Sequence, residues 1–488
     1  MQTIFFRKGL IFLLILLLVI TTVVSSFNCR IINQSESINR GNWLYVGGSG
    51  PGNYSTIQSA IDASFYGDTV FVFDDSAPYY ENIEIYKTIN LIGENKDTTI
   101  INGGWLDVIN ITADKVNISG FTITNKGNRS HPGLLQNGLY IQSDYNSIYN
   151  NNIINTDFSI SGPYSKGNKI TGNNIQGYHK GIDLYNSSCN TIKGNNIFGS
   201  DNAISLGYSG GSTNKIGNNI IMVNNISNNF GAIGLGSNNN TVVGNNISNN
   251  WFGLVLSWSA SGNNIAGNII NQNKLDSISL NYWCINNIIT DNTILNNGYG
   301  IRIIGSIDNI IMGNIISMNS GDGLELTWFS SFNTITDNII NGNHECGILL
   351  DDSSNNTIIT DNTIADNYLD GIHLSSPSNT ITDNVISNND FGIKLYYSSD
   401  NIISGNVVAN HLTGIYLRES SDNEITRNNF KGNIVNAFFR ECKNSWDANY
   451  WNRPRILPKL IFGVRKIDDF SIPWFQLDLH PANQPYEV

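Results

Sequence analysis

Short apolar motifs recur along most of the chain, each with apolar residues at alternate positions and each beside a Gly or an Asn. Three motifs follow one another in a fixed order and then repeat. The first reads N-x-I, the second G/D-N-x-I and the third G-I-x-L or a close variant, as in Asn333–Ile335, Asp337–Ile340 and Gly347–Leu350. Successive copies lie roughly 21 to 24 residues apart. Alternation over so short a run predicts β-strands.

Three short strands per repeat, with no helix between them, exclude Rossmann and TIM-barrel folds. The pattern predicts an all-β, single-stranded parallel β-helix, in which each turn stacks on the previous one at about 4.8 Å. We expect three strands per coil and about 15 coils, with the Ile and Leu side chains filling the core. Gly and Asn tolerate the left-handed backbone of sharp corners, and stacked Asn side chains can hydrogen-bond along the coils.

The two ends of the predicted β-helix depart from the repeat. Ile57, Ala60 and Ile61 lie at helical spacing after a possible capping box, Ser55–Gln58, so we expect a capping helix over residues 54–64. Strands are predicted at 69–73, 83–85, 89–92 and 98–101. Beyond about Arg440 the repeat gives way to Trp, Pro and Arg, which predicts an irregular C-terminal cap over the exposed strand edges.

The N-terminal segment has the pattern of a targeting signal. Arg7 and Lys8 precede an uncharged apolar run and small residues, which predicts a signal peptide cleaved after Ser26. A retained membrane anchor is the alternative, because the uncharged stretch approaches membrane-spanning length. The predicted organisation is therefore 1–26 signal peptide or N-terminal membrane anchor, 27–43 flexible segment, 44–104 N-terminal cap and first coils, 105–440 β-helix repeats and 441–488 C-terminal cap.

Composition narrows the classes of function. The hydrophobic content of 40% is ample for a core and argues against disorder. Only 14% of the 488 residues are charged, and the formal net charge is −12. An acidic chain with few basic residues argues against a nucleic-acid partner. We expect a secreted or cell-envelope protein that meets a membrane only through an uncleaved N-terminal segment.

Several segments resemble a known family. Pro51–Ile61, with Gly67–Val70 and Leu91–Asn95, is similar to the start of many secreted pectin-lyase-like proteins. The G-N-N-I and G-I-x-L coils, together with Asn444–Trp451, resemble NosD-type or CASH (carbohydrate-binding and sugar-hydrolysis) repeat proteins. The resemblance implies a right-handed β-helix at the cell surface. It says little about function, because such proteins include copper-centre maturation proteins and sugar-active enzymes.

Copper is the first candidate ligand that the resemblance suggests. Copper binds clustered His, Met or Cys ligands, and the 6 His, 5 Cys and 4 Met do not converge in the repeat. His344 and His411 share a predicted column but lie three coils apart, and His344 with Cys346 is the only close pair. The sequence therefore predicts no bound metal or cofactor and makes copper handling the least favoured role. Ca²⁺ held by carboxylates is the one alternative.

A carbohydrate-binding site is the favoured functional hypothesis. It would lie on the sheet formed by the third motif, whose x residue faces outward. Exposed aromatic residues beside acids are typical of a sugar groove. The candidate ligand-binding residues are Trp258, Tyr282, Trp283, Trp328, Phe329 and Tyr396. Catalysis would use some combination of Arg302, Glu325, Asp351, Asp352 and His373. The competing interpretation is a solvated sheet face on which charges such as Arg302 and Glu325 offset each other.

We therefore expect a non-catalytic surface protein that binds an extracellular polysaccharide or a component of the cell envelope. A polysaccharide lyase, hydrolase or epimerase is the alternative. Glycosylation is a further candidate modification, because Asn186 and Asn355 fit the N-x-S/T pattern in predicted turns.

Overall fold

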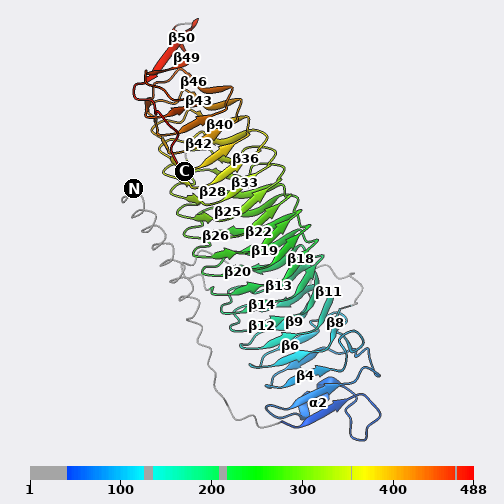
Figure 1. Cartoon of the computed structure of the whole chain (residues 1–488). Helices are drawn as coiled ribbons and strands as arrows, with labels where there is room; N and C mark the ends of the chain where they lie inside the picture. Colours follow the sequence, from blue (N-terminus) through cyan, green and yellow to red (C-terminus); the bar gives the residue numbers. More distant parts are fainter. Residues whose placement is uncertain (1–40, 126–135, 208–216, 353, 468–469, 488) are drawn as a thin grey trace. The chain divides into compact units, whose positions relative to one another are not determined.

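Coils built from short parallel strands make up almost all of the described residues (Figure 1). The structure is a computed structural model that describes residues 41–125, 136–207, 217–352, 354–467 and 470–487, so the predicted segment 1–26 lies outside it. The described residues form an all-β right-handed parallel β-helix of about 18 turns with almost no helix. The predicted fold class is confirmed, and the expected 15 coils were too few, because the first and last coils lack the repeat motifs that were counted.

The described residues form two compact units, which are treated separately. The first contains the chain up to Asn245 together with Ser261–Asn264. The second contains Asn246–Ala260 together with the chain from Ile265 onward. No helix in the described residues is long and apolar enough to cross a membrane.

The first unit begins with strand β1 (Trp43–Val46) and helix α2 (Ile57–Ala63), which buries Ile57, Ala60 and Ile61. The predicted helix is thus present, but its N-cap is Thr56, which accepts from the amide of Ser59. The expected capping box fails because Gln58 binds Asp62 and the amide of Glu84 instead. The predicted early strands follow, 83–85 with the expected ends and the others with ends shifted by one or two residues: β2 (Thr69–Val72), β3 (Ile83–Ile85), β4 (Asn90–Gly93) and β5 (Ile100–Asn102).

One coil of the second unit shows how the repeat builds the core. It consists of β32 (Thr334–Thr336), β33 (Ile339–Asn341) and β34 (Ile348–Leu350). The side chains of Ile335, Ile340, Ile348 and Leu350 are fully buried. Burial of each such side chain contributes about 1.5 to 3 kcal/mol. Each strand pairs in parallel with its counterpart in the next coil, so the apolar side chains stack in register.

Buried asparagines form hydrogen-bonded rows along the coils. In the second unit, the Asn of the second motif donates from Nδ2 to Oδ1 of the equivalent Asn one coil later, as in Asn314 to Asn338 and Asn338 to Asn362. We call this set the amide row: Asn268, Asn292, Asn314, Asn338, Asn362, Asn384, Asn406, Asn428 and Asn449. The row confirms the predicted stacking, while the left-handed corner falls on the preceding residue, such as Asp337 at φ 56°.

The glycine of the third motif has a different role from the one predicted. Gly300, Gly323, Gly347 and Gly371 have no left-handed φ. Each instead lies where a Cβ atom would meet the glycine carbonyl oxygen of the next coil, at 2.0 Å for Gly300 and 2.7 Å for Gly323. These glycines are therefore required by the close approach of neighbouring coils rather than by conformational freedom.

The non-repeating C-terminal segment contains an antiparallel hairpin that the sequence pattern did not reveal. Its strands are β49 (Lys459–Ile467) and β50 (Phe470–Asp478). Two side chains of β50 end the rows of asparagines, because Gln476 accepts from the amide of Asn444 and Asp478 from the amide of Asn449. Asp478 is fully buried and also accepts from the Trp451 indole at 2.9 Å. The hairpin thus satisfies donors that a bare last coil would leave unpaired.

Candidate functional site

Charged side chains gather on one sheet of the second unit, the sheet formed by the third motif. The relevant strands are β25 (Asp276–Asn281), β28 (Tyr299–Ile304), β31 (Leu324–Thr327), β34, β37 (Asp370–Leu374) and β40 (Phe391–Tyr396). The strand register aligns Ser279, Arg302, Glu325, Leu349, His373 and Lys394 in one outward column. Beside it, the residues preceding each motif glycine, or Ser277 in its place, form a second, more buried column, which includes Asp276, Tyr299, Asp322, Cys346, Asp370 and Phe391.

Arg302 and Glu325 meet as the sequence suggested. The Arg302 Nε donates to Glu325 at 2.7 Å, and one terminal nitrogen lies 3.3 Å from Asp276. The guanidinium also lies 4.8 Å from the centre of the Tyr299 ring. Partial burial lowers the pKa of Arg302, but its hydrogen bond and charge pairing with Glu325 and Asp276 outweigh this effect and raise it overall. Arg302 is therefore held between two carboxylates on neighbouring coils, which is the arrangement of a paired sheet face.

A second cluster surrounds Asp370. Its Oδ2 atom lies 2.9 Å from His373 Nδ1, 3.1 Å from Lys394 Nζ and 4.0 Å from Cys346 Sγ. Asp370 and Cys346 are 3% and 5% exposed, whereas His373 is half-buried. His373 was predicted from the sequence as a candidate catalytic residue, whereas Asp370 and the environment of Cys346 were not. The sequence signal that could have revealed both residues is the position before each motif glycine, where a carboxyl or thiol group replaces the usual apolar or Asn residue.

Asp322 is the most perturbed carboxyl group on this sheet. It is buried one coil before Cys346, and its Oδ1 accepts from the Cys346 amide at 2.8 Å. Burial raises the pKa of Asp322 from 3.8 to about 7, although the hydrogen bond from the Cys346 amide opposes the shift. Burial also raises the pKa of the Cys346 thiol, and the charges of Asp370 and Asp322 act in the same direction. Near neutral pH this part of the sheet thus holds a proton that an exposed aspartate would have lost.

The raised pKa predicts how pH affects stability. The folded state keeps the Asp322 proton up to a pH of about 7, whereas the unfolded chain loses it near 3.8. The contribution of Asp322 is therefore complete below pH 3.8 and is lost as pH rises to about 7. We expect Asp322→Asn to gain roughly 2 to 4 kcal/mol relative to the wild type between pH 4 and pH 8. Urea denaturation in EDTA at several pH values measures the difference. Asp366→Asn, at an exposed position, is the control, and parallel pH profiles for Asp322→Asn and wild type would contradict the prediction.

Aromatic side chains line the corner that follows this sheet. We call Trp258, Tyr282, Trp283, Trp328 and Phe329 the aromatic edge. All five are exposed, from 46% for Tyr282 to 73% for Trp258, and all five have positive φ, between 54° and 63°. A left-handed backbone costs roughly 1 to 2 kcal/mol per non-glycine residue, and for bulky residues it is a genuine outlier. The corner requires this backbone in other coils too, since Gly305, Asp352 and Tyr397 also have positive φ. The fold does not explain why large exposed aromatic residues occupy these positions, because Gly, Asn and Asp adopt the conformation at lower cost.

The members of the aromatic edge lie on successive coils. The rings of Trp258 and Tyr282 lie 6.2 Å apart, and the amide of Trp283 donates to the carbonyl of Gly305 on the following coil. Gly305 in turn donates to the carbonyl of Thr327, the residue before Trp328. Gly305 has no side chain, so its coil contributes no aromatic ring between the two aromatic pairs, and the Tyr282 ring lies 3.9 Å from where a Cβ atom of Gly305 would be.

The remaining predicted residues lie around this edge. Asp352 is exposed one coil beyond Trp328 and accepts from the Thr327 hydroxyl at 3.1 Å, while Asp351 is half-buried beside it. Tyr396 is half-buried, with the Arg418 guanidinium 5.0 Å from its ring centre, so the exposed Tyr397 presents more of its surface. Of the predicted catalytic set, the structure therefore joins Arg302 to Glu325 and leaves His373 and the two aspartates in separate contacts.

The glycosylation candidates lie at corners in both units. Asn186 and Asn355 are half-buried, and the side-chain oxygen of each is buried without a hydrogen-bond partner. Thr357, which completes the second sequon, is fully buried. Modification at either site stays a prediction.

Two histidines considered for copper have structural contacts. His411 is buried and takes the place of an asparagine in a row, since its Nδ1 lies 3.1 Å from the Asn389 amide nitrogen. Burial lowers the pKa of His411. His344 contacts the carbonyl of Asn319 at 3.3 Å. His411 is thus in register with Asn343, which precedes His344, so the two histidines do not share a column as the motif spacing suggested.

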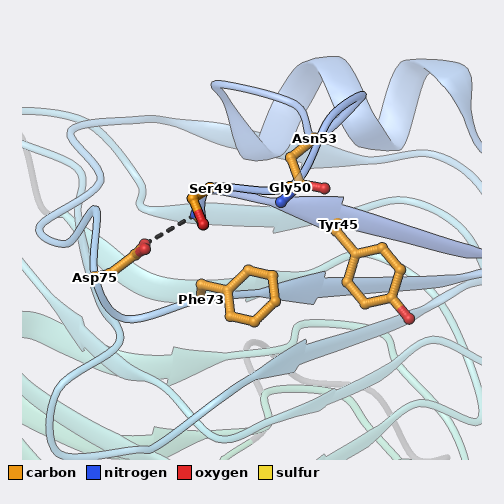
Figure 2. Close-up of a pocket in the computed structure, with 7 residues that line it drawn as sticks. Tyr45, Ser49, Gly50, Asn53, Phe73 and Asp75 are labelled. Carbon is orange, nitrogen blue, oxygen red and sulfur yellow. Dashed lines mark hydrogen bonds between the residues drawn. The ribbon is translucent and has the colours of Figure 1, made fainter.

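The first unit contains a shallow pocket of about 370 Å³ near its N-terminal end (Figure 2). Its lining includes Tyr45, Asn53, Phe73 and Asp75, and the Asp75 carboxylate accepts from the Gly48 amide at 2.9 Å. Asp75 is the single ionisable acid in the lining, and it is engaged by this backbone contact. The pocket therefore offers less chemistry than the sheet of the second unit.

Two family models match parts of the chain, and one of them describes the fold seen in the structure. A family model described as "Right handed beta helix region" matches residues 218–334. A second, described as "Periplasmic copper-binding protein (NosD)", matches residues 322–464, which include Asp322, Cys346, Asp370 and His373. No curated protein is significantly similar to the chain in sequence.

Solved structures with a similar fold share little sequence. The A-module of the Azotobacter vinelandii mannuronan C-5 epimerase AlgE6 is 16% identical, with a TM-score of 0.42, and the match covers 68% of this chain and 94% of that one. A catalytic domain of a GH87 alpha-1,3-glucanase is 13% identical, with a TM-score of 0.40, covering 75% and 66%. These likenesses carry no argument about activity. The family models and the repeat geometry together show that the chain is a right-handed parallel β-helix repeat protein, which is similar to the NosD type over residues 322–464.

Proposed function

We propose that this protein acts outside the cytoplasm and binds an extracellular polysaccharide or a cell-envelope glycan along the aromatic edge, without turning it over. The observation that carries the proposal is the set of five exposed aromatic residues held in left-handed backbone. The corner itself requires left-handed backbone, which Gly, Asn or Asp adopt at lower cost, so the exposed aromatic residues at these positions point to a functional requirement. Sugar rings stack on aromatic faces, and polar groups at the rim bind their hydroxyls.

The geometry of the edge suits an extended chain of sugars. Coils repeat at about 4.8 Å, which is comparable with the length of one pyranose unit, so consecutive sugars can meet consecutive coils. Gly305, which has no side chain, lies on the coil between the Tyr282–Trp283 pair and the Trp328–Phe329 pair. Asp352, next to Trp328, supplies a carboxylate at the rim. The site is therefore a surface track rather than a closed pocket.

Binding is favoured over catalysis because the ionisable side chains of the neighbouring sheet are engaged with one another. Arg302 pairs with Glu325 and Asp276, and Asp370 pairs with His373 and Lys394. Asp322, with its raised pKa, has the protonation of a general acid, but it is 4% exposed and its Oδ1 is engaged by a backbone amide. A hydrolase or lyase needs placed carboxyl groups that reach the substrate.

Copper handling is the less favoured role. The matching family model carries copper in its name, but the pair of histidines that the sequence offered does not form a site. His411 belongs to a buried row, and His344 contacts a backbone carbonyl.

Substitution on the aromatic edge tests the proposal. We expect Trp328→Ala to weaken binding by more than about tenfold, because central aromatic anchors typically contribute 2 kcal/mol or more. An array of neutral and uronic-acid polysaccharides would identify the ligand, and isothermal titration of the hit would give the dissociation constant. Tyr368→Ala is the control, since Tyr368 is also an exposed aromatic residue but lies at another corner.

Turnover assays separate binding from catalysis. Reducing-sugar and unsaturated-uronate assays with the same polysaccharides should give no product. Product formation that disappears in Glu325→Gln or Asp352→Asn would identify an enzyme and overturn the non-catalytic proposal. Equal binding by Trp328→Ala and wild type would exclude the aromatic edge as the site.

A further inference from the structure

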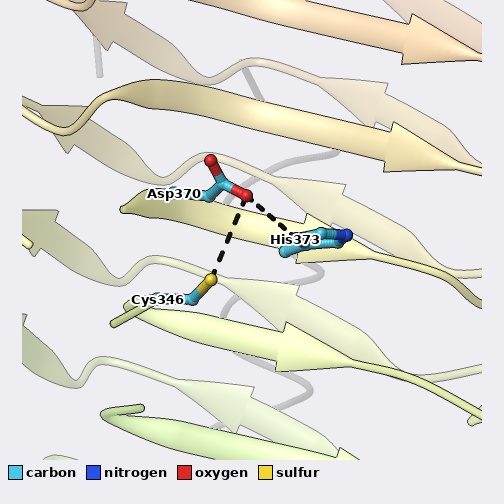
Figure 3. Close-up of side chains that lie close together, drawn as sticks. All are labelled: Cys346, Asp370 and His373. Carbon is cyan, nitrogen blue, oxygen red and sulfur yellow. Dashed lines mark hydrogen bonds and ion pairs between the residues drawn. The ribbon is translucent and has the colours of Figure 1, made fainter. Parts of the chain in front are cut away.

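The cluster around Asp370 places three metal-ligating side chains together (Figure 3). Cys346 Sγ, one carboxylate oxygen of Asp370 and one ring nitrogen of His373 all lie within 4.8 Å of one another. The Cys346 thiol and Asp370 come from equivalent positions on successive coils, whereas Asp370 and His373 lie on the same strand, β37. The three donors therefore converge from two rigid coils rather than from flexible loops.

The separations of the donor atoms are close to those of a metal site. Zn²⁺ binds thiolate at about 2.3 Å and His nitrogen or carboxylate oxygen at about 2.0 to 2.2 Å, so tetrahedral geometry separates the donors by roughly 3.3 to 3.7 Å. The distance between Cys346 Sγ and Asp370 Oδ2 is 4.0 Å, and that between Asp370 Oδ2 and His373 Nδ1 is 2.9 Å. Side-chain movements of less than 1 Å, roughly, would bring both distances into the range of such a site.

The surroundings of the cluster also suit a cation. Cys346 and Asp370 are buried, which favours a coordinated over a solvated donor, while half-buried His373 leaves one side open to water as a fourth ligand. The other ring nitrogen of His373 lies 3.5 Å from the Ser375 hydroxyl, which can orient the ring. Lys394 opposes a cation, since its ammonium lies 3.1 Å from Asp370, but its side chain is partly exposed and can turn outward.

We propose that Cys346, Asp370 and His373 form a three-ligand site for Zn²⁺, with water in the fourth position. One thiolate, one carboxylate and one imidazole match the ligand preferences of this ion. The site is on the sheet face, apart from the aromatic edge, so it stands independently of the proposed glycan binding. The sequence predicted no metal here, because motif spacing did not bring Cys346 and Asp370 together.

Titration with Co²⁺, a spectroscopic substitute for Zn²⁺, tests the site in the metal-free protein with its thiols reduced. We expect one equivalent of Co²⁺ to produce a thiolate-to-cobalt absorption band, which Zn²⁺ then displaces. Cys346→Ser and His373→Ala should abolish the band and weaken Zn²⁺ binding by more than about 100-fold. Lys394→Met should strengthen binding, because it removes a competing positive charge. A merely structural hydrogen-bond network would not produce this gain.

Two controls keep the interpretation specific. Cys284→Ser removes another buried free thiol, and His344→Ala removes a histidine near Cys346 in sequence; both should bind Co²⁺ as the wild type does. No band at millimolar Co²⁺, or a band that survives Cys346→Ser or His373→Ala, would overturn the proposal. Glycan binding measured on the same variants should be unchanged, so the failure of either proposal can be recognised separately.

Discussion

Replacing Gly300 with alanine should strongly lower the free energy of unfolding of the second unit. A Cβ atom at this position would lie 2.0 Å from the carbonyl oxygen of Gly323 and 2.6 Å from a methyl group of Ile316. The first contact is with backbone, which cannot move without separating β28 from β31. Overpacking typically costs 1 to 3 kcal/mol and occasionally more, so we expect a loss of at least about 3 kcal/mol. The shift of the urea midpoint, followed by circular dichroism, measures it.

A matched glycine separates this effect from the general consequences of losing a glycine. Gly234 lies in β19 (Gly231–Leu235) and has no left-handed φ. A Cβ atom added there would meet one neighbouring atom, the Ile204 carbonyl oxygen, at 3.9 Å. Gly234→Ala should therefore leave stability unchanged or raise it by about 0.4 to 1 kcal/mol through the unfolded state. Equal midpoints for Gly300→Ala and wild type would show that the coils can move apart, and would refute the close-approach explanation.

Removal of Asn338 from the amide row should have a comparable effect for a different reason. Its side chain donates to the carbonyl of Ile311 and to Oδ1 of Asn362, and it accepts from the amide of Asn314. Asn338→Ala leaves the buried Asn314 amide unpaired and removes one donor from each of the Ile311 and Thr336 carbonyls. Each such group costs about 1 to 3 kcal/mol, so we expect a total loss of roughly 3 to 5 kcal/mol.

Hydrogen exchange measured by mass spectrometry is the sharper assay, because long repeats need not unfold in a single step. Loss of protection should be greatest in peptides covering residues 311–340 and should decrease away from that coil. Asn341→Ala is the control in the same coil, since Asn341 is on the outer side of β33 and the next coil already has Ala365 in register. Similar exchange in both variants would contradict the role of the row.

The fold was predictable because the repeat is written directly in the residues that build it. Ile at alternate positions indicated strands, and Asn at a fixed place in each motif indicated stacking. The role of the motif glycine was not predictable, because a left-handed turn and a close backbone approach require the same residue. The hairpin of β49 and β50 was not predicted, because it occurs only once. The strands of the coils were recognised by their repeat, and a single element has none.

The candidate site was only partly predictable for a similar reason. Arg302 and Glu325 occupy the same motif position, so their contact followed from register alone. Asp370 and Cys346 lie at the position before the glycine, which most coils fill with other residues, and their approach to His373 depends on how the chain turns into the strand. The aromatic edge was foreseen as exposed, but its left-handed backbone could be found only in the structure.

The aligned side chains of the amide row have a net dipole along the coils. Every Nδ2 in the row, from Asn268 to Asn449, points toward the next coil, so the side-chain dipoles add head to tail and leave partial positive charge at the C-terminal end. The Asp478 carboxylate lies at that end, 3.3 Å from the last Nδ2, as an anion does at the start of a helix. Direction is therefore built into the row. A coil inserted within it preserves the polarity, whereas a coil added beyond Asp478 would place a buried negative charge in its middle.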